Sequence, residues 1–89
     1  MIIVGHAGHL FGLKADTGQV SWSIDFASLD QCGGCAGEAV EVQPADDATV
    51  YAACAGHVFR IAVDDGSIHW HSSLRQRGSS DTSLALFKK

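Results

Sequence analysis

The sequence has 89 residues, of which 46% are hydrophobic and 18% are charged, and its formal net charge is −4. This composition is that of a globular chain rather than a disordered one, and the length allows one small domain or a piece of a larger one. The six basic residues are spread along an acidic chain, which argues against a nucleic-acid partner, and no apolar run is long enough to span a membrane.

Three short strands are predicted first, over residues 2–6, 9–14 and 19–25, because these stretches are rich in β-branched and aromatic residues. Ala7-Gly8 is predicted to form a two-residue hairpin turn. A longer turn follows, in which Asp16 is expected to cap the backbone and Gly18 to take a left-handed conformation. The opening MIIVGHAGHLF has no basic flank, so it is not a signal peptide, and this favours a cytoplasmic location.

A connector rich in glycine and cysteine comes next, over residues 27–37. The stretch 38–44 then alternates and ends at Pro44, as an additional strand would. Three further strands are predicted over residues 49–54, 57–63 and 67–73, with turns at Ala55-Gly56 and from Asp64 to Gly66. The polar tail leads to an apolar segment, LALF, that begins another unit.

The chain repeats itself at an offset of 48 residues, which is the period of a repeat architecture. The matching positions are Ala7, Gly8, His9, Phe11, Asp16, Gly18 and Trp22 in the first copy, and Ala55, Gly56, His57, Phe59, Asp64, Gly66 and Trp70 in the second. Alternation places His9, Phe11 and Leu13 on one strand face, and Val20, Trp22 and Ile24 together on another. The reverse faces carry Leu10, Val58 and Ala62 and are also apolar, which predicts sheets that are covered on both sides.

Antiparallel four-stranded units with a period in the forties are typical of β-propeller blades. The prediction is an all-β chain that forms about two blades of a partial, open propeller. Residues 1–26 would be an incomplete first blade, 27–37 a connector, 38–74 a second blade, and 75–89 a connector with the start of a further blade. Because a propeller closes with roughly four to eight blades, the chain is expected to be a fragment or to assemble from copies.

The two copies resemble the PQQ-type, or quinoprotein-like, propeller repeat. A glycine turn, an apolar strand, a Thr-Gly pair and a tryptophan four residues after that glycine carry the resemblance. The residues involved are Gly8, Leu10, Leu13, Ala15, Thr17, Gly18 and Trp22, then Gly56, Val58, Ile61, Gly66 and Trp70. Both copies lack the aspartate of the family pattern, since Lys14 and Ala62 stand at its positions.

The resemblance implies a propeller, and it is compatible with several functions. Family members include quinone-dependent dehydrogenases and non-enzymatic scaffolds. The cofactor residues and adjacent-cysteine ring of the dehydrogenases have no match here, so no bound cofactor and no catalytic residue are predicted. Within the repeat, Trp22 and Trp70 are expected to pack between blades with Phe11 and Phe59, because buried aromatic residues dominate such interfaces. Trp70→Ala would then cost about 3–5 kcal/mol, as loss of a large buried aromatic does.

Cys32 and Cys35 form a C-x-x-C motif, which can supply half of a zinc site or a redox pair. Cys54, His6 or a histidine of the pair His69 and His71 would have to complete a zinc site. The alternative is a loop whose thiols have no chemical role, since there is no second C-x-x-C motif. His9 and His57 occupy equivalent positions after a glycine turn, where they are expected to serve the repeat itself.

Three functions compete. The first is a scaffold or a module that binds a protein, a peptide or another ligand, with the remaining blades of a larger chain or further copies as partners. The second is part of a PQQ-dependent dehydrogenase, and the third is a small metal or redox module based on cysteine. The first of these requires nothing that the sequence lacks and is the one predicted.

Overall fold

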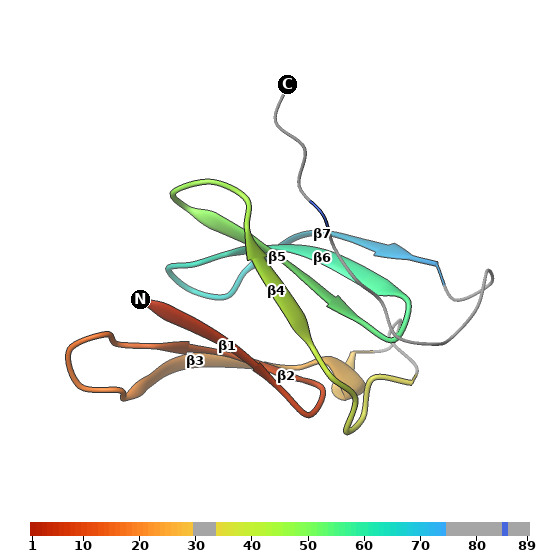
Figure 1. The fold of residues 1–89 in the computed structure, drawn as a ribbon, viewed down its shortest axis with the longest axis horizontal. Helices are drawn as coiled ribbons and strands as arrows, with labels where there is room; N and C mark the ends of the chain where they lie inside the picture. The colour runs from red at the N-terminus through yellow and green to blue at the C-terminus, as the bar shows by residue number, and fades with distance from the viewer. Residues whose placement is uncertain (30–33, 75–84, 86–89) are drawn as a thin grey trace.

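The chain folds into two antiparallel β-sheets, which confirms the all-β prediction (Figure 1). The computed structural model describes residues 1–29, 34–74 and 85. The first sheet has three strands, β1 (Ile2–His6), β2 (His9–Leu13) and β3 (Val20–Asp25), and the second has four, β4 (Glu41–Pro44), β5 (Thr49–Cys54), β6 (His57–Ala62) and β7 (Ile68–Ser73). A single 3-10 turn, η1 (Phe26–Ser28), is the only helical element in the described ranges, and none of these residues forms a helix able to cross a membrane.

The pairing of the strands follows the sequence repeat residue by residue. Ile2 pairs with Leu13 in the first sheet, and 48 residues later Val50 pairs with Ile61 in the second. The irregularity between Gly12 and Leu13 recurs between Arg60 and Ile61. β4 is the strand without a counterpart in the first sheet.

The two-residue turns form as predicted, and they have the same geometry in both copies. Ala7 and Gly8 have φ values of 48° and 80°, and Ala55 and Gly56 have values of 48° and 86°. A positive φ at both positions is the turn that matches the twist of a hairpin.

The longer turns also repeat, but a different residue caps them. The amide of Gly18 donates to the carbonyl of Lys14 over 2.7 Å, and Gly66 is left-handed as well, with φ of 76°. The expected caps were Asp16 and Asp64. Instead, the hydroxyl of Thr17 and the carboxylate of Asp65 accept the amides of Gln19 and Ser67, because the amides of Gly18 and Gly66 already donate to backbone carbonyls.

A β-bulge overturns the expectation that Val20 shares a face with Trp22. Val20 pairs with Leu13, whereas Trp22 pairs with the preceding residue, Gly12. The bulge inserts one residue into β3, so the alternation of faces changes there. Trp22 and Ile24 face the second sheet, while Val20 lies beside Leu13 on the outer side.

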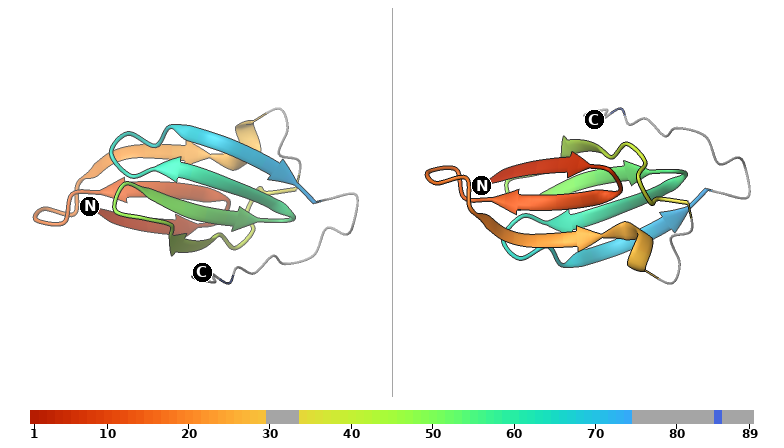
Figure 2. Two further views of the ribbon diagram at one scale, coloured as in Figure 1. Left: turned by 90° about the horizontal axis from the view of Figure 1, so that it is seen from above. Right: turned by 90° about the horizontal axis from the view of Figure 1, so that it is seen from below.

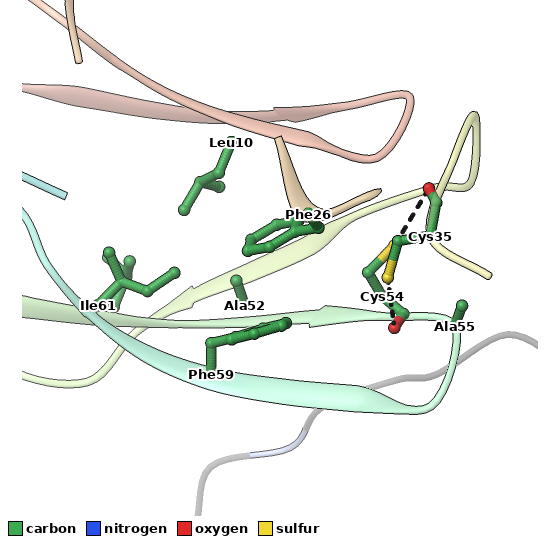
Figure 3. Packing of buried hydrophobic residues seen from close by; sticks show 9 residues of the cluster. Leu10, Phe26, Cys35, Ala52, Cys54, Ala55, Phe59 and Ile61 are labelled. Carbon is green, nitrogen blue, oxygen red and sulfur yellow. Dashed lines mark hydrogen bonds between the residues drawn. The ribbon is translucent and has the colours of Figure 1, made fainter. Parts of the chain in front are cut away.

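The core lies between the two sheets, which are stacked face to face (Figure 2). Leu10 from β2 and Phe26 from η1 project towards the second sheet, where they contact the cluster of Ala52, Phe59 and Ile61 (Figure 3). The rings of Phe26 and Phe59 stack with centroids 4.5 Å apart. Full burial of these side chains supplies the main favourable term in folding.

The connector ties the first hairpin to the second sheet. Gly8 donates its amide to the carbonyl of Glu38 over 2.7 Å, and the amide of Glu38 donates to the carbonyl of Cys35. A Cβ atom at Gly8 would lie 2.2 Å from that carbonyl oxygen, so only glycine allows this approach. Cys35 in turn contacts Cys54 at the end of β5.

Candidate docking surface and thiol pair

Trp22 joins the two sheets. Its indole Nε1 donates to the carbonyl of Val63 over 2.8 Å. Its ring lies against Gly12 on its own sheet and Gly66 on the other, where added Cβ atoms would come within 2.3 and 2.7 Å of the ring. Trp22 therefore packs between the sheets, and two glycines make room for it.

Trp70, the repeat counterpart of Trp22, is not between sheets. It pairs with Arg60 on the outer face of the second sheet and is 43% exposed. Burial of this residue was expected from the repeat alone, but burial needs a covering layer, and the exposure of Trp70 shows that none lies over its side chain. Arg60 also stands where Gly12 stands in the first copy, so an arginine side chain lies beside Trp70 at the position where Trp22 has a glycine.

We call the outer surface formed by Tyr51, Val58, Arg60 and Trp70 the Trp70 face. The ring centroids of Tyr51 and Trp70 are 6.0 Å apart, and the guanidinium of Arg60 lies 5.6 Å from the centroid of Tyr51. Contacts of this kind between aromatic rings and a cation hold the side chains in place. Exposed tryptophan, tyrosine and arginine are the residues that most often anchor protein interfaces.

Arg60 is fixed by a polar network that the sequence did not reveal. Its Nη2 lies 2.9 Å from Asp46 Oδ2, and its Nε donates to the hydroxyl of Thr49 over 3.1 Å. Asp46 also accepts the amides of Ala48 and Thr49. These backbone hydrogen bonds, the Thr49 hydroxyl and the Arg60 charge lower the pKa of Asp46 to about 2. The D-x-x-T spacing after Pro44 is the signal that was missed.

The two predicted phenylalanines have different environments. Phe59 is fully buried in the core, whereas Phe11 lies half-buried on the outer side of the first sheet. There the ring of His9 stacks on Phe11 with centroids 5.8 Å apart. We call the outer surface of Ile2, Val4, Phe11 and Leu13 the Phe11 face. It is the second apolar surface that the described residues leave uncovered.

Of the predicted metal ligands, the structure brings together Cys35 and Cys54, while Cys32 lies outside the described residues. Cys35 Sγ donates to the carbonyl of Cys54 over 3.4 Å, and Cys54 Sγ lies 3.8 Å from the carbonyl of Cys35 (Figure 3). Both are buried thiols. The contact between Cys35 in the connector and Cys54 at the end of β5 depends on tertiary packing, so no sequence motif predicts it.

His71 on β7 pairs with Phe59 and makes a diagonal side-chain contact with His57 on β6. The Nδ1 of His57 lies 2.9 Å from the Nε2 of His71, and the ring of His71 stacks on Phe59. Burial, and then the nearby His57, lower the pKa of His71. The suggested pair of His69 and His71 is not what the structure forms, since His69 is exposed.

No set of three metal-binding side chains gathers among residues 1–29 and 34–74. A pocket of about 380 Å³ opens between β1 and β4, with mostly aliphatic walls. Asp46 and Asp47 are the only side chains in its lining that titrate, and Asp46 is already held by the network around Arg60.

Comparison with known proteins adds no relative to this picture. No family model, no curated protein sequence and no solved structure matches the chain.

Proposed function

We propose that this chain is a non-catalytic repeat module that binds protein through the outer face of its second sheet. The observation that carries the proposal is the exposure of Trp70 at the position whose counterpart, Trp22, joins the two sheets. A large aromatic side chain beside tyrosine and a fixed arginine is the composition of an interface anchor. The module acts as a scaffold, with its partner on the Trp70 face.

The resemblance to PQQ-type repeats supports a propeller-type arrangement of such modules. The Trp-to-carbonyl contact of Trp22 and the glycines around it are consistent with packing of one blade on the next. A role as part of a PQQ-dependent dehydrogenase is less well supported, because the carboxylates of Asp46 and Asp47 are the only polar side chains among the aliphatic residues that line the pocket between β1 and β4. A cofactor site built from a whole ring of blades would need concave enclosure that two sheets do not supply.

Site-specific photo-crosslinking tests the proposal. A photoreactive phenylalanine analogue placed at position 70 should give protein adducts in cells that make the protein. The same analogue at position 20, which is also exposed but lies off the Trp70 face, should give far fewer. Equal yields at the two positions would contradict a docking role. Saturable one-to-one binding of PQQ with calcium, followed by tryptophan fluorescence, would contradict the non-catalytic assignment.

A cysteine-based metal or redox module is the second candidate, and the approach of Cys35 to Cys54 favours it. Thiolates are the strongest protein ligands for zinc, and a complete site would need two further ligands. Stoichiometric zinc that is retained on dialysis and lost in Cys35→Ser would support this role. Identical zinc content in the wild type and in Cys35→Ser would rule it out.

A further inference from the structure

We propose that two copies of this chain associate head to tail, with the Trp70 face of one copy on the Phe11 face of the next. This inference rests on the proposed docking function and names its partner. The interface between the two sheets of one chain provides the geometry, because each outer face is the repeat counterpart of one of the two inner faces.

The Trp70 face corresponds to the inner side of the first sheet. Leu10, Trp22 and Phe26 contact the second sheet, and at an offset of 48 their counterparts are Val58, Trp70 and Leu74. The backbone path is the same at the ends of both sheets, since Phe26 donates to the carbonyl of Gly8 and Leu74 to that of Gly56. Leu74 is 43% exposed, whereas Phe26 is fully buried, so these counterparts present apolar surface that a partner would cover.

The Phe11 face corresponds to the inner side of the second sheet, which receives Trp22. Val50 and Phe59 are buried there, and their counterparts are Ile2 and Phe11. Ile2 is 48% exposed, against 7% for Val50. The Phe11 face therefore has the same residue types as a surface that already accepts a sheet in this molecule.

The place beside Gly18 that would receive Trp70 of another copy is unoccupied in the single chain. Trp22 lies against Gly66, whereas a Cβ atom at Gly18, the counterpart of Gly66, would meet nothing within 4 Å. Val63, whose carbonyl accepts the Trp22 indole, corresponds to Ala15. In the assembly, the indole of Trp70 therefore donates to the carbonyl of Ala15 in the next copy and its ring covers Gly18.

Arg60 is the main departure from the intramolecular interface. It replaces Gly12, so the next copy would meet a guanidinium at this point of the face instead of a glycine. Asp46 and Thr49 pair the guanidinium, so docking does not bury an unpaired charge. The net charge of −4 on each copy opposes association, so the assembly should strengthen as salt screens that charge.

Contacts of this type are heterologous, because each copy uses two different faces. Two variants with opposite defects test this directly. Trp70→Ala removes the anchor and leaves the Phe11 face intact, and Ile2→Ser damages the Phe11 face and leaves Trp70 intact. Both residues are exposed, so both variants should fold, which far-UV circular dichroism checks.

Sedimentation velocity over a concentration series gives the readout. The wild type should form growing oligomers, and Trp70→Ala should weaken self-association by about 30-fold or more, as loss of a buried aromatic anchor does. Ile2→Ser should also weaken self-association over the same concentration series. An equimolar mixture of the two variants should form a dimer that cannot extend, because one intact face remains on each copy.

Val20→Ser is the matched control. Val20 is aliphatic like Ile2 and is 53% exposed. Its counterpart in the second sheet, Ile68, stays 39% exposed although the first sheet packs on the second, so docking of another copy should leave Val20 exposed as well. Val20→Ser should therefore associate like the wild type. A monomeric wild type at every concentration, or a mixture that stays monomeric, would overturn the proposal. If position 70 then still crosslinks to other proteins, the docking function stands and only the identity of the partner is wrong.

Discussion

Alanine at a positive φ is an uncommon residue for a two-residue turn, and this chain uses it twice. Ala7 and Ala55 both have φ of 48°. A side chain in this region costs about 1–2 kcal/mol, while asparagine adopts it more readily. These two turns therefore hold the hairpins together at some cost to stability.

Ala7→Asn should raise the free energy of unfolding by about 0.5–1 kcal/mol, because asparagine relieves the left-handed strain without the added chain entropy of glycine. Urea denaturation measures the change. Ala27→Asn is the matched control, since Ala27 is exposed and has no positive φ. Equal effects of the two substitutions would show that the turn is not strained.

His71 should make stability depend on pH. Its pKa is lowered from 6.5 in the folded chain, by burial and by His57, so the unfolded chain binds the proton more readily. The stability that His71 contributes is complete above pH 6.5 and is lost as the pH falls through the lower folded pKa. Urea midpoints across this range should fall more steeply for the wild type than for His71→Gln. Parallel curves would contradict the assignment.

Individual residues were predicted well only where local rules decide them. Gly8 and Gly18 were placed correctly because a turn requires their conformation. The exposure of Trp70 and the contact of Cys35 with Cys54 depend on which layers meet, and a repeat pattern does not contain that information.

At the level of elements, alternation and turn residues located all seven strands. The error came from the bulge between Gly12 and Leu13, because one inserted residue moves Val20 to the opposite face from Trp22. Nothing in the residue types around Val20 marks the insertion. The repeat of the same irregularity at Arg60 indicates that it belongs to the fold of the unit.

The turn between β4 and β5 is held by Asp46, whose carboxylate also reaches Arg60 on β6. Because its pKa is lowered from 3.8 to about 2, its contribution to stability is present above pH 3.8 and lost as the pH falls towards 2. Asp46→Asn should therefore destabilise the chain at neutral pH. The difference from the wild type should disappear in that acidic range, as measured by urea unfolding.

Asp47→Asn serves as the control for Asp46, because Asp47 is the adjacent exposed carboxylate outside this network. It should leave the urea midpoint at neutral pH close to that of the wild type. A loss of stability equal to that of Asp46→Asn would attribute the effect to net charge rather than to the turn.

For the whole molecule, the two tryptophans should have very different effects on stability. Trp22→Ala opens a cavity between the sheets and removes the bond to Val63, which should cost about 3 kcal/mol or more. Trp70→Ala should cost under about 1 kcal/mol in the monomer, since its side chain is on an uncovered face. This replaces the larger cost that the repeat alone predicted for Trp70.

Thermal and urea unfolding of dilute samples, in which oligomers are absent, provide the comparison between the two tryptophan variants. Similar losses for both would mean that Trp70 is covered within the monomer. A small loss for Trp22→Ala would mean that the sheets do not depend on this contact.

Each sheet is a meander in which every strand pairs with its neighbour in sequence. Such pairing has a low contact order, so short loops close first and hairpins form in about 1–10 μs. Contacts between the sheets, such as that of Leu10 with the cluster around Phe59, join different meanders and close longer loops than the hairpins do. We therefore expect the sheets to dock after the hairpins form, and the fluorescence of Trp22 in a Trp70→Phe background should report that step.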